Sequence, residues 1–101
     1  MKTFKDGYEL NPTDDLGFAK MRLACNEFKR QTGGAVTGKV EQIWADFGAG
    51  AWWWQIAIYR SNGRSFQLGG NDRQKILNAC CMEEITAAVL HCIEEYPSLY
   101  K

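Results

Sequence analysis

The sequence has little of the chemistry that catalytic and metal sites need. Its 101 residues include one histidine, His91, and no glycine-rich phosphate-binding pattern opens a helix. The cysteines lie at positions 25, 80, 81 and 92, and neither the 80–81 pair nor the 91–92 pair has the spacing of zinc ligands. On a helix, neighbours such as His91 and Cys92 point about 100° apart, which excludes a catalytic pair. We therefore expect no enzyme activity, no metal and no cofactor.

The chain also lacks net charge and long apolar runs. Twelve basic side chains balance twelve acidic ones, whereas binding of a general polyanion depends on an excess of cations. No apolar run approaches the roughly 20 residues that span a bilayer, and the N-terminal residues lack the apolar core of a signal peptide. Three of the four cysteines would share one helix, which is poor geometry for disulfides, so free thiols are expected. These features predict a cytoplasmic protein with no membrane contact.

What is present suffices for one hydrophobic core. Apolar residues make up 46% of the chain and aromatic residues 13%, which is not typical of a disordered protein. Two domains would each be too small for a stable core. We expect a single domain over residues 1–101, divided into an N-terminal arm (1–11), a core (12–95) and a tail (96–101). The arm is either a short strand or an irregular packed segment.

A helix is predicted from about Pro12 to Gln31. Asn11 is a typical N-cap, proline is favoured at the first helical position, and Gly33 and Gly34 are typical of a helix end. The stripe that we expect to be buried consists of Phe18, Met21, Cys25 and Phe28. A smaller stripe on the opposite side, available to a homodimer or another partner, consists of Leu16, Ala19 and Leu23.

Three strands are predicted after this helix. Residues 36–45 are rich in β-branched side chains, with an imperfect alternation that suggests a bulge near Gly38. Residues 51–60 alternate cleanly. Their expected core face consists of Trp52, Trp54, Ile56 and Ile58.

The turn before the third strand sets its register. A three-residue loop, 61–63, with Gly63 in the left-handed conformation places Phe66 opposite Ile58. This arrangement keeps the apolar residues of the third strand, 64–68, on the core face. A two-residue loop would divide them between both faces.

A long final helix is predicted from Asn71 or Asp72 to about Glu95, before Pro97. Its buried stripe is expected to comprise Leu77, Cys81, Ile85, Ala88, Val89 and Cys92. The sheet and the helices each have an apolar face to cover. The predicted fold class is therefore α+β, a two-layer domain in which two helices flank a three-stranded antiparallel meander.

Three consecutive tryptophans in one strand are the feature that most needs an explanation. If Trp52 and Trp54 enter the core, Trp53 must leave it, and Tyr59 shares its face, which is open in a two-layer fold. Exposed aromatic residues and arginines are typical of interface centres. The candidate partner-binding residues are Trp53, Tyr59, Lys39, Arg60, Arg64, Arg73 and Lys75. The alternative is that the arm covers Trp53 with Phe4, Tyr8 or Leu10.

Over residues 12–95 the order of elements resembles the double-stranded-RNA-binding domain. That resemblance implies recognition of RNA by shape, through the first helix, the loop between the first two strands and the start of the last helix. In this sequence the loop 46–50 lacks the family's Pro-x-His, and only Arg73 and Lys75 stand where a lysine cluster is expected. The resemblance therefore covers the topology and departs from the family at the site.

The chain is also similar, in its general character, to the small anti-CRISPR inhibitors that phages and mobile elements encode. The similarity lies in small size, a single domain and the lack of catalytic motifs, and the neutral charge differs from the acidic DNA-mimicking members. It implies a non-catalytic inhibitor that binds a protein or ribonucleoprotein target, such as an RNA-guided nuclease. An RNA-binding module is the alternative.

Overall fold

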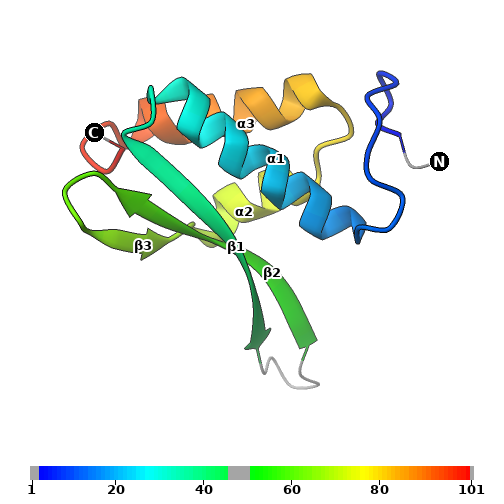
Figure 1. Ribbon diagram of the computed structural model, residues 1–101, viewed down its shortest axis with the longest axis horizontal. Helices are drawn as coiled ribbons and strands as arrows, with labels where there is room; N and C mark the ends of the chain where they lie inside the picture. Colours follow the sequence, from blue (N-terminus) through cyan, green and yellow to red (C-terminus); the bar gives the residue numbers. More distant parts are fainter. Residues whose placement is uncertain (1–2, 46–50, 101) are drawn as a thin grey trace.

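Within the residues that the structure describes, 3–45 and 51–100, the chain forms three helices and one antiparallel sheet, shown in Figure 1 as a computed structural model. In chain order the elements are α1 (Leu16–Gln31), β1 (Val36–Ala45), β2 (Ala51–Arg60), β3 (Ser65–Gln67), α2 (Gly70–Leu77) and α3 (Met82–Glu95). The strands lie in the order β1-β2-β3. The predicted α+β class with a three-stranded meander is confirmed.

β1 and β2 pair without interruption, starting from Val36 opposite Arg60. The predicted bulge near Gly38 is therefore wrong. Glycine is needed at position 38 for packing, because a Cβ atom there would lie only 2.8 Å from Sγ of Cys25. The missing side chain lets α1 approach the sheet closely.

The turn before β3 is the three-residue loop that the sequence predicts. Gly63 has a φ of 83°, and Phe66 pairs with Ile58. β3 is shorter than the predicted segment 64–68. Because it ends at Gln67, no strand in the described part of the chain pairs on that side with the part of β2 nearer its N-terminus.

The hydrophobic core lies between the sheet and the helices. Its sheet side comprises Val36, Ile56, Ile58 and Leu68, with Trp54 and Phe66 packed against them. Its helical side includes Met21, Cys25, Phe28, Ile76, Ile85, Val89 and Cys92. The side chain of Trp52, which we predicted in the core, lies outside the described part of the structure.

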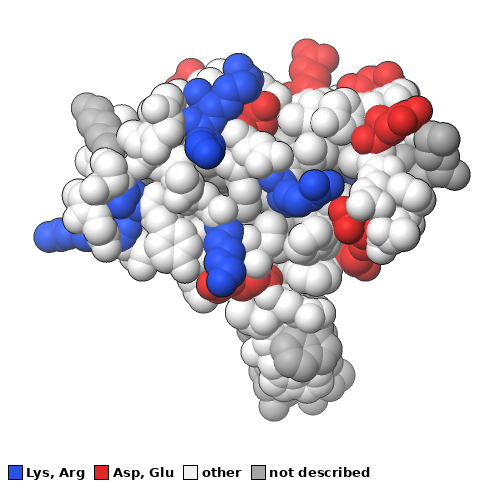
Figure 2. Space-filling view, in the orientation of Figure 1, with Lys and Arg blue, Asp and Glu red and all other residues white. Residues whose placement is uncertain are grey.

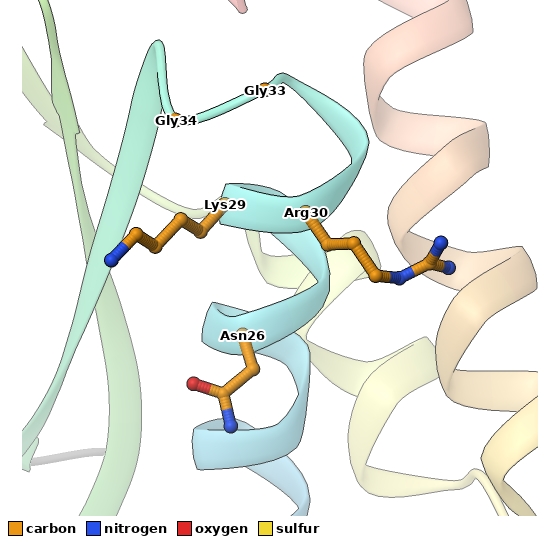
Figure 3. A pocket seen from close by; sticks show the side chains of 5 residues that line it. All are labelled: Asn26, Lys29, Arg30, Gly33 and Gly34. Carbon is orange, nitrogen blue, oxygen red and sulfur yellow. The ribbon is translucent and has the colours of Figure 1, made fainter.

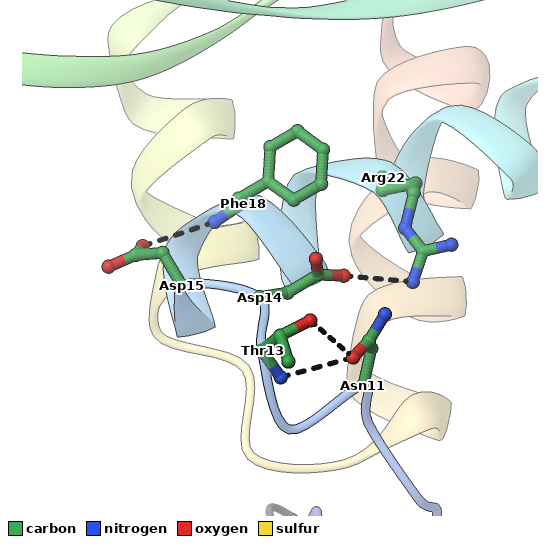
Figure 4. A network of polar contacts seen from close by, with 6 residues as sticks. All are labelled: Asn11, Thr13, Asp14, Asp15, Phe18 and Arg22. Atoms are coloured by element: carbon green, nitrogen blue, oxygen red, sulfur yellow. Dashed lines mark hydrogen bonds and ion pairs between the residues drawn. The ribbon is translucent and has the colours of Figure 1, made fainter.

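α1 begins at Leu16, later than predicted, because Asp15 rather than Asn11 caps it. Oδ1 of Asp15 accepts hydrogen bonds from the first turn of the helix, and the indole N–H of Trp54 donates to the same oxygen at 2.8 Å. Asn11 instead accepts hydrogen bonds from the backbone N–H and the hydroxyl of Thr13 (Figure 4). Trp54 of the sheet thus supports Asp15 as the capping residue, through a hydrogen bond that Asn11 does not receive from it.

The second stripe predicted on α1 is mostly not a free surface. Ala19 and Leu23 are buried, whereas Leu16 is exposed. α1 contacts the sheet on one side and α2 and α3 on the other, so it needs two apolar sides. The prediction that this stripe is available to a partner is therefore wrong for Ala19 and Leu23.

The predicted long final helix is in fact two helices. α2 ends at Leu77, and α3 begins at Met82. The N-terminal arm holds the break: the N–H of Lys5 donates to the carbonyl of Cys80 at 2.8 Å, and the N–H of Met82 donates to Oδ2 of Asp6 at 3.3 Å. Asp6 thus places a carboxylate at the N-terminus of α3, where negative charge is stabilising.

The segment predicted as a tail, 96–101, packs into the core through Tyr100. The ring of Tyr100 is buried and stacks on that of Phe28, with their centroids 5.3 Å apart. The guanidinium of Arg60 donates to the carbonyls of Ser98 and Leu99, each at 3.4 Å. These contacts fasten the C-terminal segment to β2 and α1.

Candidate binding surface

The face of the sheet turned away from α1 is the candidate site, and we call it the outer face. α1 packs on the opposite face, where the ring of Phe18 lies 5.3 Å from that of Trp54. Because side chains alternate along a strand, the outer face carries every second residue. These residues are Thr37, Lys39, Glu41 and Ile43 from β1, Trp53, Gln55, Ala57 and Tyr59 from β2, and Ser65 and Gln67 from β3.

Trp53 lies on the outer face, and an arginine packs over it. The guanidinium carbon of Arg73 lies 4.7 Å from the centroid of the Trp53 ring, which is a cation–π distance. The same guanidinium donates to Oε1 of Gln55 at 2.8 Å. Arg73 reaches this face from α2 past the edge of β2 that the short β3 leaves open. Trp53 is half-buried as a result.

Part of the outer face is therefore closed, contrary to the expectation of a wholly open face. Gln55 exposes only 4% of its surface, and Ala57 is also buried. The amide of Gln55 is bonded at both ends, because its Nε2 donates to the carbonyl of Leu68 at 3.0 Å. Arg73 and Leu68, which both follow β3 in the chain, supply the partners that the sequence pattern of β2 does not reveal.

The open part of the outer face lies around Tyr59 and Lys39. Tyr59 exposes 43% of its surface, and it lies opposite Thr37 in the register. Lys39 is exposed opposite Ala57. Together with Trp53 and Arg73, these side chains give a face that combines two aromatic rings with two cations.

The other candidate residues lie elsewhere. Arg60 holds the C-terminal segment on the core side of the sheet, with its guanidinium 5.8 Å from the centroid of the Phe66 ring. Arg64 is exposed beside the turn before β3. Lys75 lines a hollow of about 430 Å³ between α2 and α3, next to Glu84 and His91. The predicted set therefore divides into four residues on the outer face and three away from it.

Phe4 and Leu10 of the arm do not supply the cover that the alternative interpretation required, and the ring of the exposed Tyr8 lies 6.2 Å from that of Phe4. Phe4 and Leu10 belong to the buried core. Phe4 also lines a hollow beside α1 with Ala79 and Cys80, next to the connection between α2 and α3. Arg73 provides the cover over Trp53 instead.

Trp44 is a surface aromatic residue that the sequence analysis missed. It exposes 57% of its surface near the end of β1, where the β1–β2 hairpin extends beyond the helices (Figure 1). Element lengths could have indicated this, since a ten-residue strand spans about 33 Å and the sixteen residues of α1 about 24 Å. Because the strand is longer than the helix that packs on it, the end of the hairpin extends past the helix and is not covered by it.

The two buried thiols are not activated as nucleophiles. Burial raises the pKa of the Cys25 and Cys92 thiols to about 12, with a contribution from Asp72 at Cys92. Both thiols stay protonated at neutral pH. His91 lies 3.0 Å from Glu95 on the surface of α3. In the described ranges, no cluster of three or more His, Cys, Asp or Glu side chains could hold a metal ion.

The described helices include none with the length and apolarity to cross a bilayer. Comparisons of the chain with protein-family models, with curated proteins and with solved structures found no match.

Proposed function

We propose that this protein acts without catalysis. The outer face of its sheet binds another protein and blocks the activity of that protein. The observation that carries this proposal is the exposed Tyr59, which shares a sheet face with Lys39 and with the Trp53–Arg73 stack. Tyrosine, tryptophan and arginine are the residues enriched at the energetic centres of protein interfaces. The stack holds Trp53 and Arg73 in place before binding, which reduces the entropy lost on association.

The charges of the outer face favour a protein partner over RNA. Lys39 and Glu41 lie two residues apart on β1, so a cation and an anion alternate along the same strand. On the side of the molecule that Figure 2 shows, in which α1 lies in the foreground of the ribbon view, the Lys and Arg side chains also occupy separate places rather than one continuous patch. Phosphate binding relies on several cations acting together. A mixed surface with aromatic residues is more typical of a protein interface.

The target class that we propose is an RNA-guided nuclease of bacterial defence, following the general resemblance to anti-CRISPR inhibitors. A direct test mixes the purified protein with such a nuclease, its guide RNA and a plasmid target, and measures cleavage. We expect the wild-type protein to inhibit cleavage and to bind the nuclease complex in a titration.

Two tyrosines offer a matched pair of variants for this test. Tyr59 on the outer face and Tyr96 after α3 expose 43% and 45% of their surfaces. Tyr59→Ala is expected to weaken binding about tenfold or more, whereas Tyr96→Ala keeps wild-type affinity. Equal affinity of the two variants would exclude the outer face as the site.

A pull-down from bacterial lysate, with and without nuclease treatment, extends the test to other targets. Captured proteins that remain after nuclease treatment, and that Tyr59→Ala fails to capture, support a protein partner. Binding that disappears with nuclease and weakens steeply with salt would support the RNA-binding alternative instead.

A further inference from the structure

The backbone groups of β1 that point away from β2 can be identified. In the pairing of β2 with the segment 64–68, the N–H of Arg60 donates to the carbonyl of Arg64, and the N–H of Leu68 donates to that of Ile56. The backbone groups of even-numbered residues in β2 therefore point toward β3, and those of odd-numbered residues point toward β1.

The register of β1 with β2 shows which residues of β1 point their backbone groups toward β2. Lys39 pairs with Ala57 and Glu41 with Gln55, so the odd-numbered residues of β1 bond β2. The even-numbered residues Gly38, Val40 and Gln42 point their N–H and C=O groups to the outer edge. No hydrogen bond joins these edge groups to another residue in the described part of the chain. Such an edge is a template for a further strand.

We propose that β1 pairs antiparallel with β1 of a second copy of this chain, around a twofold axis at Val40. Val40 then faces Val40 of the second copy, and Gly38 faces Gln42. Each of these pairs consists of residues whose backbone groups point to the edge, so about six hydrogen bonds form. A twofold contact of one strand with itself closes as a dimer and leaves no further edge of β1 open.

The charges on β1 select this register. With the axis at Val40, Lys39 of each copy lies opposite Glu41 of the other, and the chain itself gives neither side chain an ion pair among its described residues. A register moved by two residues would set Lys39 against Lys39 or Glu41 against Glu41, which is unfavourable. A shift by one residue would turn every side chain to the wrong face.

The same register accounts for the exposed Trp44. It sets Trp44 of one copy beside Val36 of the other, on the side of the sheet that carries α1. A hollow of about 490 Å³ opens at that end of α1, lined by Asn26, Lys29, Arg30, Gly33 and Gly34. In Figure 3, Lys29 and Asn26 extend toward the side of β1, whereas Arg30 extends toward α3. An indole ring in this hollow would pack against the aliphatic stem and ammonium of Lys29.

The first test is the mass of the wild-type protein in solution, measured by sedimentation over a range of concentrations. We expect the mass to rise from that of one chain to that of two. If the mass stays that of one chain up to about millimolar concentration, the dissociation constant of a dimer would be weaker than about millimolar, which is very weak for a specific contact. That result would overturn the proposal. In that case Lys39 only protects the edge from pairing.

Charge reversal at two positions tests the register itself. Lys39→Glu alone and Glu41→Lys alone each set like charges opposite one another, so each variant is expected to dimerise at least tenfold more weakly. An equimolar mixture of the two variants restores both opposite-charge pairs, and we expect a dimer with one chain of each. The double variant Lys39→Glu/Glu41→Lys is expected to dimerise as the wild type does.

Controls separate this contact from other causes. Lys75→Glu reverses a charge on α2, away from the edge, and should leave dimerisation unchanged. Circular dichroism should show that every variant is folded. A wild-type dimer that Lys39→Glu does not weaken, or a mixture that stays monomeric, would contradict β1 pairing. None of these measurements involves the blocked target, so the inference and the proposed function can fail separately.

Discussion

Arg73 donates a hydrogen bond to the side-chain oxygen of Gln55 at 2.8 Å, joining the first turn of α2 to the middle of β2. The other end of the same amide donates to the carbonyl of Leu68. Gln55 thus bonds twice to the segment that follows β3. These bonds close the part of the β2 edge that β3 is too short to cover, and they hold Arg73 over Trp53.

Replacing Gln55 with alanine is expected to destabilise the protein by about 1 to 3 kcal/mol, because the guanidinium of Arg73 and the carbonyl of Leu68 lose their partner. Urea unfolding measures the change. Gln67→Ala is the matched control, since Gln67 is exposed on the same face in β3, and it should change stability by less than about 0.5 kcal/mol. Equal losses of stability in the two variants would show that the hydrogen bonds of the buried Gln55 amide add no more stability than an exposed glutamine does.

The cap that Asp6 supplies to α3 gives a second prediction. Asp6→Ala removes the carboxylate that accepts from the N–H of Met82, and it should lower stability by about 0.5 to 2 kcal/mol. Asp6→Asn keeps an acceptor oxygen and loses the charge at the helix N-terminus, so a smaller loss is expected. Glu9→Ala, at another exposed acid of the arm, is the control. Thermal unfolding of all three variants decides whether the arm stabilises the helix break.

Local patterns predicted the register of β2 with β3 well because it depends on neighbouring residues. Gly63 fixes the turn, and the turn fixes Phe66 opposite Ile58. Strict alternation likewise placed Trp53 away from Trp54. Each of these inferences uses only contacts between residues that are close in the chain or paired through one short loop.

The helix break and the closed part of the outer face depend on distant residues. The backbone N–H of Cys80 donates to Oε2 of Glu84 at 2.8 Å, so a capping interaction exists locally, but cysteine is not a typical residue before such a helix. The rest of the break depends on Lys5 and Asp6, more than seventy positions away in the chain. Arg73 reaches Trp53 from α2, the element that follows β3 in the chain. The apolar and polar pattern within a single segment does not predict contacts with residues so far away in the chain.

The close approach of α1 to β1 gives a third prediction. Gly38→Ala brings a methyl group to within 2.8 Å of Sγ and 3.2 Å of Cβ of Cys25, and overpacking of this kind costs about 1 to 3 kcal/mol. The double variant Gly38→Ala/Cys25→Ala removes the sulfur atom and should recover part of the loss. Gly70→Ala, where nothing lies within 4 Å, should instead stabilise α2 by a few tenths of a kcal/mol, up to about 1. A loss at Gly38 that does not depend on Cys25 would contradict the packing argument.

The buried thiols give a pH dependence whose sign can be worked out. Burial raises the pKa of Cys25 and Cys92 from 9.0 to about 12. Between those values the unfolded chain releases thiol protons that the folded chain retains, so the free energy of unfolding falls as the pH rises. The contribution of these thiols is complete below about pH 9 and is lost as the pH rises toward about 12, by up to about 1.4 kcal/mol per pH unit for each thiol.

Urea unfolding under reducing conditions at about pH 8 and about pH 10 measures this slope. Other groups titrate in the same range, but they are common to every variant, so the comparison isolates the thiols. Cys25→Ala and Cys92→Ala should each flatten the fall in stability, although both lower stability at pH 8 by leaving a cavity. Gly70→Ala removes no thiol and meets no neighbour within 4 Å, so it should keep the wild-type slope. The same slope in all four proteins would mean that the buried thiols ionise as readily in the folded chain as in the unfolded one.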